Sequence, residues 1–131
     1  MLGPLRGDDK RGNTAMKYSG SCQCGKVAFD VDMTIEKVMS CNCSRCRRLG
    51  TLLAFAPKDD FTLKSGRDAL TEYQFNKHVI HHYFCTTCGI QSFSEAVDPK
   101  TGAPTVAVNV RCLEGVDPDS FEVMKFDGAR M

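Results

Sequence analysis

The chain has 131 residues, of which 42% are hydrophobic and 25% charged, the proportions of a globular protein with its own core. Its formal net charge of +1 excludes a strong overall field, so neither nucleic acid nor an anionic membrane is expected as a partner. No apolar run approaches the roughly 18 to 20 residues that a membrane-spanning helix needs. The N-terminus lacks the apolar segment of a secretory signal, and we therefore expect a cytoplasmic protein.

The first segment, residues 1–16, is charged and glycine-rich. We expect it to be a flexible tail, either native or artificial, because Met16 would also make a natural start. The remaining residues, 17–131, have the length of a single domain.

Short alternating segments dominate the rest of the chain. Alternation of apolar and polar residues predicts strands at 26–32, 51–57, 61–66, 70–76, 78–84, 90–97, 104–112 and 121–126. Short helices are predicted at 44–50 and 34–39. These elements predict a mainly β domain of antiparallel strands with one or two short helices, in which bound zinc supplements a modest core.

The eight cysteines fall into short-spaced groups. Disulfides need an oxidising compartment, and cysteines two or three residues apart do not readily bond to each other. Thiolates at such spacings can instead surround one metal ion, so we favour metal binding. The groups are a Cys-x-Cys pair (Cys22, Cys24), a Cys-x-Cys-x-x-Cys triplet (Cys41, Cys43, Cys46), a Cys-x-x-Cys pair (Cys85, Cys88) and Cys112 alone.

The two pairs together supply the four thiolates of a tetrahedral zinc site. A glycine follows each pair, Gly25 and Gly89, where the backbone must turn tightly under the ion. Such a site would tie the first strands to a much later one and stabilise the fold. The alternative interpretation is two separate redox dithiols.

The triplet Cys41, Cys43 and Cys46 has no fourth cysteine nearby. Three protein ligands and an open position are typical of a catalytic zinc. Several residues could instead close the site and make it structural: Cys112, His78, His81 and His82.

Arginines surround the triplet in the sequence. A zinc held by three thiolates is negatively charged overall, so it activates water poorly and suits a fourth sulfur better. Arg45, Arg47 and Arg48 could offset this charge and bind carboxylates, or they could form a solvated helix face. A thiol that carries carboxylates, such as glutathione, fits the first interpretation.

Five stretches between about Ser19 and Gly128 resemble one known family, and they stand in its order and spacing. They are "GSCQCGKVAFDV", "CNCSRCRRLG", "HHYFCTTCGIQSF", "VAVNVRCLEGVD" and "FDG". They resemble the glutathione-dependent formaldehyde-activating enzyme family, which includes centromere protein V-like proteins. The resemblance implies an Mss4-like fold with two zinc ions per chain. It implies a structural zinc on the pairs, at Cys22, Cys24, Cys85 and Cys88, and a catalytic zinc on the triplet, at Cys41, Cys43 and Cys46.

The implied activity is that of a carbon–sulfur lyase that forms S-(hydroxymethyl)glutathione from glutathione and formaldehyde, or acts on the adduct of another small aldehyde. The glutathione thiolate would take the open position on zinc and attack the aldehyde carbon. Glutathione would be bound by residues around the triplet, Asn42, Arg45, Arg47 and Arg48. This chain departs from the family pattern at Asn42 and Gln91, where the family's namesake and its subgroup respectively have histidine.

Other functions compete with the enzyme. A non-catalytic zinc module that binds another protein would expose a sizeable apolar patch. A nucleic-acid-binding zinc ribbon conflicts with the net charge. A redox dithiol at Cys85 and Cys88 would usually be followed by a helix, whereas residues 90–97 read as a strand. Aromatic residues on the alternating strands, Phe55, Tyr73 and Phe75, could line a pocket, but we expect them in the core.

Overall fold

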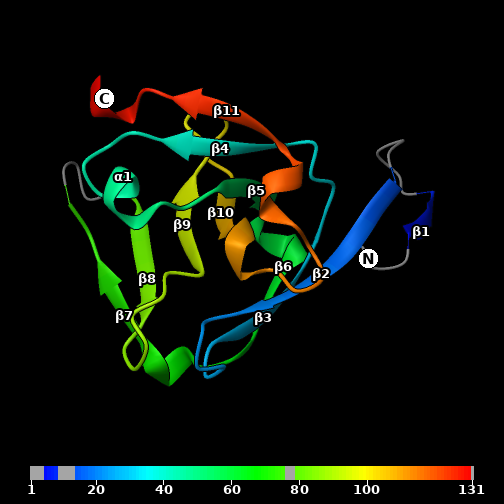
Figure 1. The fold of residues 1–131 in the computed structure, drawn as a ribbon, viewed down its shortest axis with the longest axis horizontal. Coiled ribbons are helices and arrows are strands. Elements are labelled where there is room, and N and C mark those ends of the chain that lie inside the picture. Colours follow the sequence, from blue (N-terminus) through cyan, green and yellow to red (C-terminus); the bar gives the residue numbers. More distant parts are fainter. Residues whose placement is uncertain (1–4, 9–13, 76–78, 131) are drawn as a thin grey trace.

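The structure is a computed structural model that describes residues 5–8, 14–75 and 79–130. Within these residues the chain forms two β-sheets (Figure 1). The smaller sheet has the order β1-β2-β3-β6, with bounds Leu5–Asp8, Thr14–Ser21, Ala28–Met33 and Phe61–Ser65. The larger sheet has the order β11-β4-β5-β10-β9-β8-β7. Its strands in that order are Glu122–Phe126, Lys37–Cys41, Leu53–Pro57, Pro104–Asn109, Phe93–Val97, His81–Cys85 and Leu70–Tyr73.

Helical structure is sparse in the described part of the chain. One short α-helix, α1, spans Cys46–Leu49. Five 3-10 turns complete the elements: η1 Lys58–Asp60, η2 Arg67–Ala69, η3 Val110–Cys112, η4 Pro118–Ser120 and η5 Gly128–Arg130. The prediction of a mainly β fold is thus confirmed, and all strand pairs are antiparallel except β11 with β4.

The core lies between the two sheets and is centred on three aromatic rings. Phe29 on β3 stacks on Phe61 at the start of β6, with ring centroids 5.2 Å apart. Phe93 on β9 lies 4.8 Å from Phe61 and 6.4 Å from Phe29, within the range of favourable aromatic pairs. Since β9 belongs to the larger sheet, this cluster joins the two layers.

Alternation along β3 directs its apolar side chains into this core. Phe29, Val31 and Met33 are buried, as is Val27 just before the strand. Gly20 on the paired strand β2 lies opposite Phe29, and a Cβ there would be only 2.5 Å from the Phe29 ring. A side chain at position 20 would therefore displace the central aromatic ring of the core.

Of the two predicted short helices, one is present and one is not. The helix predicted at 34–39 is wrong, because β4 occupies Lys37–Cys41 and pairs with both β5 and β11. Val38 is fully buried, and such β-branched residues favour extended backbone over helix. The helix predicted at 44–50 is confirmed as α1, which ends at Gly50 in the left-handed conformation.

The N-terminal segment contains strand structure. β2 begins at Thr14, so its first residues lie within the segment that was expected to be a tail, and β1 pairs with it. Met16 is buried and alternates with buried Tyr18, which explains why the strand extends this far. No helix in the described residues is long and apolar enough to cross a membrane.

Candidate metal centres and the adjoining pocket

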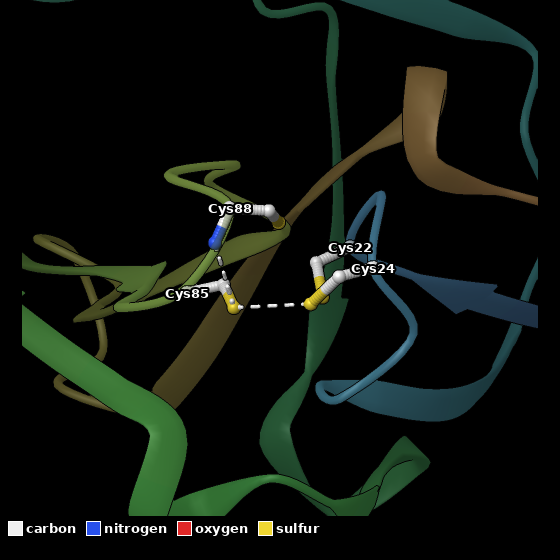
Figure 2. Close-up of side chains that lie close together, drawn as sticks. All are labelled: Cys22, Cys24, Cys85 and Cys88. Carbon is white, nitrogen blue, oxygen red and sulfur yellow. Dashed lines mark hydrogen bonds between the residues drawn. The ribbon is translucent and has the colours of Figure 1, made fainter.

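The first cluster brings together the two cysteine pairs (Figure 2). Cys22 and Cys24 lie on the turn after β2, whereas Cys85 ends β8 and Cys88 lies in the turn before β9. The Sγ atom of Cys24 is 3.7 Å from those of both Cys22 and Cys85, and all four sulfurs lie within 4.8 Å of one another. Tetrahedral zinc with bonds of about 2.3 Å places its sulfurs about 3.8 Å apart. The donor set therefore fits zinc.

The same local structure presents both pairs. Gly25 and Gly89 have φ angles of 85° and 80°, which favour glycine, and each donates its N–H to the carbonyl of the pair's first cysteine. Backbone N–H groups, chiefly that of Cys24, lower the pKa of the Cys88 thiol to about 6. Backbone N–H groups also lower the pKa of Cys85. At Cys24 the Lys26 backbone acts in the same direction, but burial and the neighbouring thiols outweigh it and raise the pKa to about 11. The Cys-x-x-Cys turn therefore favours the thiolate form that a metal ion binds, whereas Cys24 would need the ion itself to lose its proton.

The second cluster is the triplet. Cys41 ends β4, Cys46 begins α1, and Cys43 lies between them; their sulfurs lie within 4.8 Å of one another. The cluster holds three cysteines and no other cysteine, histidine or carboxylate from the described part of the chain.

Three of the four residues that could have closed the triplet are described, and none of the three belongs to it. Cys112 lies beside the first cluster. Burial raises the pKa of its thiol, and the nearby Cys22 and Cys88 thiols add to this shift. The Nδ1 atom of His81 is 2.5 Å from a Glu72 carboxylate oxygen. His82 is buried, and His78 lies outside the described residues.

Burial and backbone N–H groups act in opposite directions on the triplet. Burial, together with Cys43, raises the pKa of Cys46 to about 12, and burial also raises that of Cys41. At Cys43, burial is outweighed by hydrogen bonds, above all from the Cys46 N–H at 3.3 Å, which lower its pKa. The three sulfurs nevertheless converge within 4.8 Å of one another, and soft thiolates select ions such as zinc. The triplet therefore also fits zinc.

A pocket of about 360 Å³ is lined in part by residues that neighbour the triplet in the chain, although none of the three cysteines lines it. Two of its residues, Ser44 and Arg45, lie between Cys43 and Cys46 in the chain, so the pocket and the triplet share one short segment. The lining residues are Ser44, Arg45, Arg48, Leu49, Tyr73 and Phe75. A larger pocket of about 530 Å³ lies at β6 and η2 and contains no cysteine.

Arg45 is held in place on one edge and one face. Its Nε and Nη2 donate to the side-chain oxygen of Gln91 at 3.1 and 2.8 Å, and its guanidinium lies 4.7 Å from the centre of the Tyr73 ring. Gln91 is only 4% exposed and therefore has a fixed position. Because a guanidinium has five N–H donors, three remain for a ligand.

Aromatic rings continue the wall of the pocket. Tyr73 stacks on Phe75 at 5.9 Å, and Phe75 stacks on His82 at 5.3 Å. Burial, together with the nearby charge of Arg45, lowers the pKa of His82 to about 4, so its ring is neutral near physiological pH. Tyr73 and Phe75 thus line a pocket, while Phe55 is 49% exposed and takes no part in it.

The other candidate binding residues have different positions. Arg48 lines the pocket, and its Nη1 donates to the Ser44 carbonyl at 2.7 Å. Arg47 is exposed on α1 outside the pocket lining. Asn42 is exposed, and its side chain bonds to the C-terminal segment instead. Sequence reasoning missed Gln91 as the partner of Arg45; its only signal was the departure from histidine there.

The fold and its clusters define a mainly β protein with two cysteine sites that could bind metal. Residues 17–124 match the model of the family described as glutathione-dependent formaldehyde-activating enzyme. The crystal structure of a Rhodobacter sphaeroides protein is similar, with 33% identity and a TM-score of 0.70, covering 81% of this chain and 99% of that chain. The chain belongs to the glutathione-dependent formaldehyde-activating enzyme family. Membership supports a function related to glutathione and formaldehyde.

Proposed function

We propose that the protein is a zinc-dependent carbon–sulfur lyase that joins glutathione to a small aldehyde such as formaldehyde. The observation that carries this proposal is the three-thiol cluster, whose chain segment also supplies residues to a pocket lined by arginines. Cys41, Cys43 and Cys46 supply three ligands, and no fourth comes from the described residues. A fourth position would then be free for the substrate thiol.

The two clusters would divide the roles of two zinc ions. The four cysteines of the pairs would complete one coordination sphere and hold a structural ion. Zinc on the triplet would keep the glutathione sulfur ionised near neutral pH, while the three cysteine charges make it a poor activator of water. The ligands of this catalytic zinc would be Cys41, Cys43 and Cys46.

The pocket would bind the rest of glutathione. Arg45 offers its remaining N–H groups in a fixed plane, and Arg48 adds a second positive charge at the pocket. Carboxylates accept such paired N–H donors, and glutathione carries one at each end. Tyr73 and Phe75 supply apolar surface against the peptide. Anchoring the carboxylates would place the thiol near the triplet and lower the entropy cost of the reaction.

The reaction balances without an oxidant or reductant. The ionised sulfur attacks the aldehyde carbon, a carbon–sulfur bond forms, and the carbonyl π bond breaks. The oxygen then takes a proton from solvent and becomes a hydroxyl group. No step needs a charged histidine, which agrees with the neutral state of His82 beside Arg45.

Two matched substitutions test the proposal. Cys43→Ser removes a triplet ligand, and Cys112→Ser makes the same change at a cysteine outside both clusters. We expect Cys43→Ser to lose the acceleration of S-(hydroxymethyl)glutathione formation over the spontaneous rate, measured by NMR. Cys112→Ser should retain it. Full acceleration by a folded Cys43→Ser protein would refute the triplet as the catalytic centre.

A second candidate function is a non-catalytic zinc module that binds another protein. It is favoured by the edge strand β11, where Val123, Met124 and Phe126 are 39 to 47% exposed. Exposed apolar edge strands can pair with another chain. This function predicts that glutathione neither binds nor alters the metal content, which separates it from the enzyme.

A further inference from the structure

The end of the chain returns to the triplet. β11 pairs in parallel with β4, and its last residue Phe126 lies opposite Cys41. Figure 1 shows β11 alongside β4, with the residues that follow β11 near the segment that leads from β4 to α1. The backbone N–H of Asn42 donates to the Phe126 carbonyl at 3.1 Å, which extends the contact beyond the strands.

The Asn42 side chain fastens the turn that follows, residues 126–130. Its Nδ2 donates to an Asp127 carboxylate oxygen at 3.0 Å, and its Oδ1 accepts from the Ala129 N–H at 2.9 Å. Both ends of the amide are therefore engaged by residues more than eighty positions later in the sequence. An amide used in this way is not directed to a ligand in the pocket.

Gly128 lies against the first sulfur of the triplet. A Cβ at this position would be 2.5 Å from the Cys41 Sγ and 3.3 Å from the Cys43 Cβ. These atoms have no freedom to give way once the sulfurs are bound to a metal ion, because the ion fixes their separation. The turn therefore covers Cys41 at a distance that only glycine permits.

We propose that Asn42 is a positioning residue of the triplet and acts through the C-terminal turn, residues 126–130. Held by Asn42, the turn packs Gly128 against Cys41 and keeps the first two sulfurs in their metal-binding arrangement. The proposal rests on the proposed function in taking the triplet as the metal centre. It also explains why asparagine, with one donor and one acceptor, stands between two ligands.

The expected effect is on metal affinity. Asn42 and Cys43 follow β4 outside regular structure, so this short segment would otherwise have to be ordered when metal binds. Partners that orient ligands in this way typically change metal affinity by roughly 10- to 100-fold. The turn should contribute a similar factor at the triplet and nothing at the other cluster.

The test measures cobalt binding to the triplet while zinc stays in the four-cysteine site. Thiolate-to-cobalt absorption reports binding without any need for enzymatic turnover. Asn42→Asp sets a carboxylate against Asp127 and should weaken binding roughly 10- to 100-fold. The added negative charge alone would tighten the binding of a cation, so charge and positioning predict opposite signs.

A swapped pair provides the rescue. Asn42→Asp combined with Asp127→Asn restores one donor facing one acceptor, leaves the acceptor for Ala129, and returns the net charge to its original value. Cobalt affinity should recover most of the loss. Unchanged or tighter binding in Asn42→Asp, or no recovery in a folded double variant, would overturn the proposal.

A steric variant covers the case in which Asn42→Asp does not fold. Gly128→Ala should weaken cobalt binding at the triplet while the four-cysteine site keeps its zinc. Normal cobalt affinity in Gly128→Ala would contradict the packing argument. If the unchanged chain itself fails to bind cobalt at the triplet, the proposed function fails; if it binds and the variants do too, only this inference fails.

Discussion

The buried His82 gives a prediction about stability and pH. The residue is 5% exposed, and its Nδ1 has no hydrogen-bond partner among the residues that the structure describes. Burial lowers its pKa from 6.5 to about 4, with the charges of Arg45 and His81 adding to the effect. The unfolded chain therefore binds a proton at His82 below about pH 6.5, whereas the folded chain resists it until about pH 4. The free energy of unfolding must fall as the pH falls through this window.

The size of the effect follows from the pKa difference. Each pKa unit corresponds to about 1.4 kcal/mol, so His82 should cost about 2 kcal/mol of stability at about pH 5 relative to neutral pH. His82→Phe keeps a ring against Phe75 but cannot take up a proton. The assay is urea unfolding of both zinc-loaded proteins at about pH 7.5 and pH 5.

The comparison of the two proteins isolates His82, because both carry the same cysteine clusters and should lose metal affinity in acid alike. The unchanged protein should lose about 2 kcal/mol more than His82→Phe over this range. Equal losses in the two proteins would refute the argument that burial holds His82 neutral.

Three further predictions concern single substitutions. Gln91→Leu removes the acceptor of the Arg45 guanidinium and should raise the KM for glutathione about tenfold with little change in kcat. Gln91→Glu keeps an acceptor there and should retain the low KM. Equal KM values for the two variants would contradict the positioning of Arg45. Gly20→Ala places a Cβ against the Phe29 ring and should lower the free energy of unfolding by about 1–3 kcal/mol in urea titrations; no change would argue against the tight packing there. Cys24→Ser should lose one zinc by mass spectrometry and unfold at a lower temperature, and a variant with full zinc content would contradict the four-cysteine site.

Local patterns predicted the strands well where one face is buried. In β3 the alternation of Phe29 and Val31 with polar residues has the period of a strand and a single buried face. The segment 34–39 is too short to show a period, and its strand structure depends on pairing with β11, more than eighty residues later. Such distant pairing leaves no signal in a short window, so the helix prediction was wrong there.

In the candidate site, too, local features were predictable from the sequence and contacts between distant residues were not. Cysteine spacing predicted both clusters because the ligands of each pair or triplet lie within a single turn. The bond from Arg45 to Gln91 and the bonds from Asn42 to the C-terminal turn join residues far apart in the sequence, and no local pattern indicates them. Asn42 was predicted to bind glutathione from its place between two ligands; that role stays a prediction, and the observed bonds favour a positioning role.

The most direct test of the central claim is native mass spectrometry of the purified chain, which counts zinc before and after reduced glutathione is added. We expect two zinc ions, with glutathione binding to or removing the one held by Cys41, Cys43 and Cys46. Cys43→Ser should carry a single zinc and show no response. One zinc in the unchanged chain, or two that are indifferent to glutathione, would contradict the claim that the triplet offers an open position to a thiol.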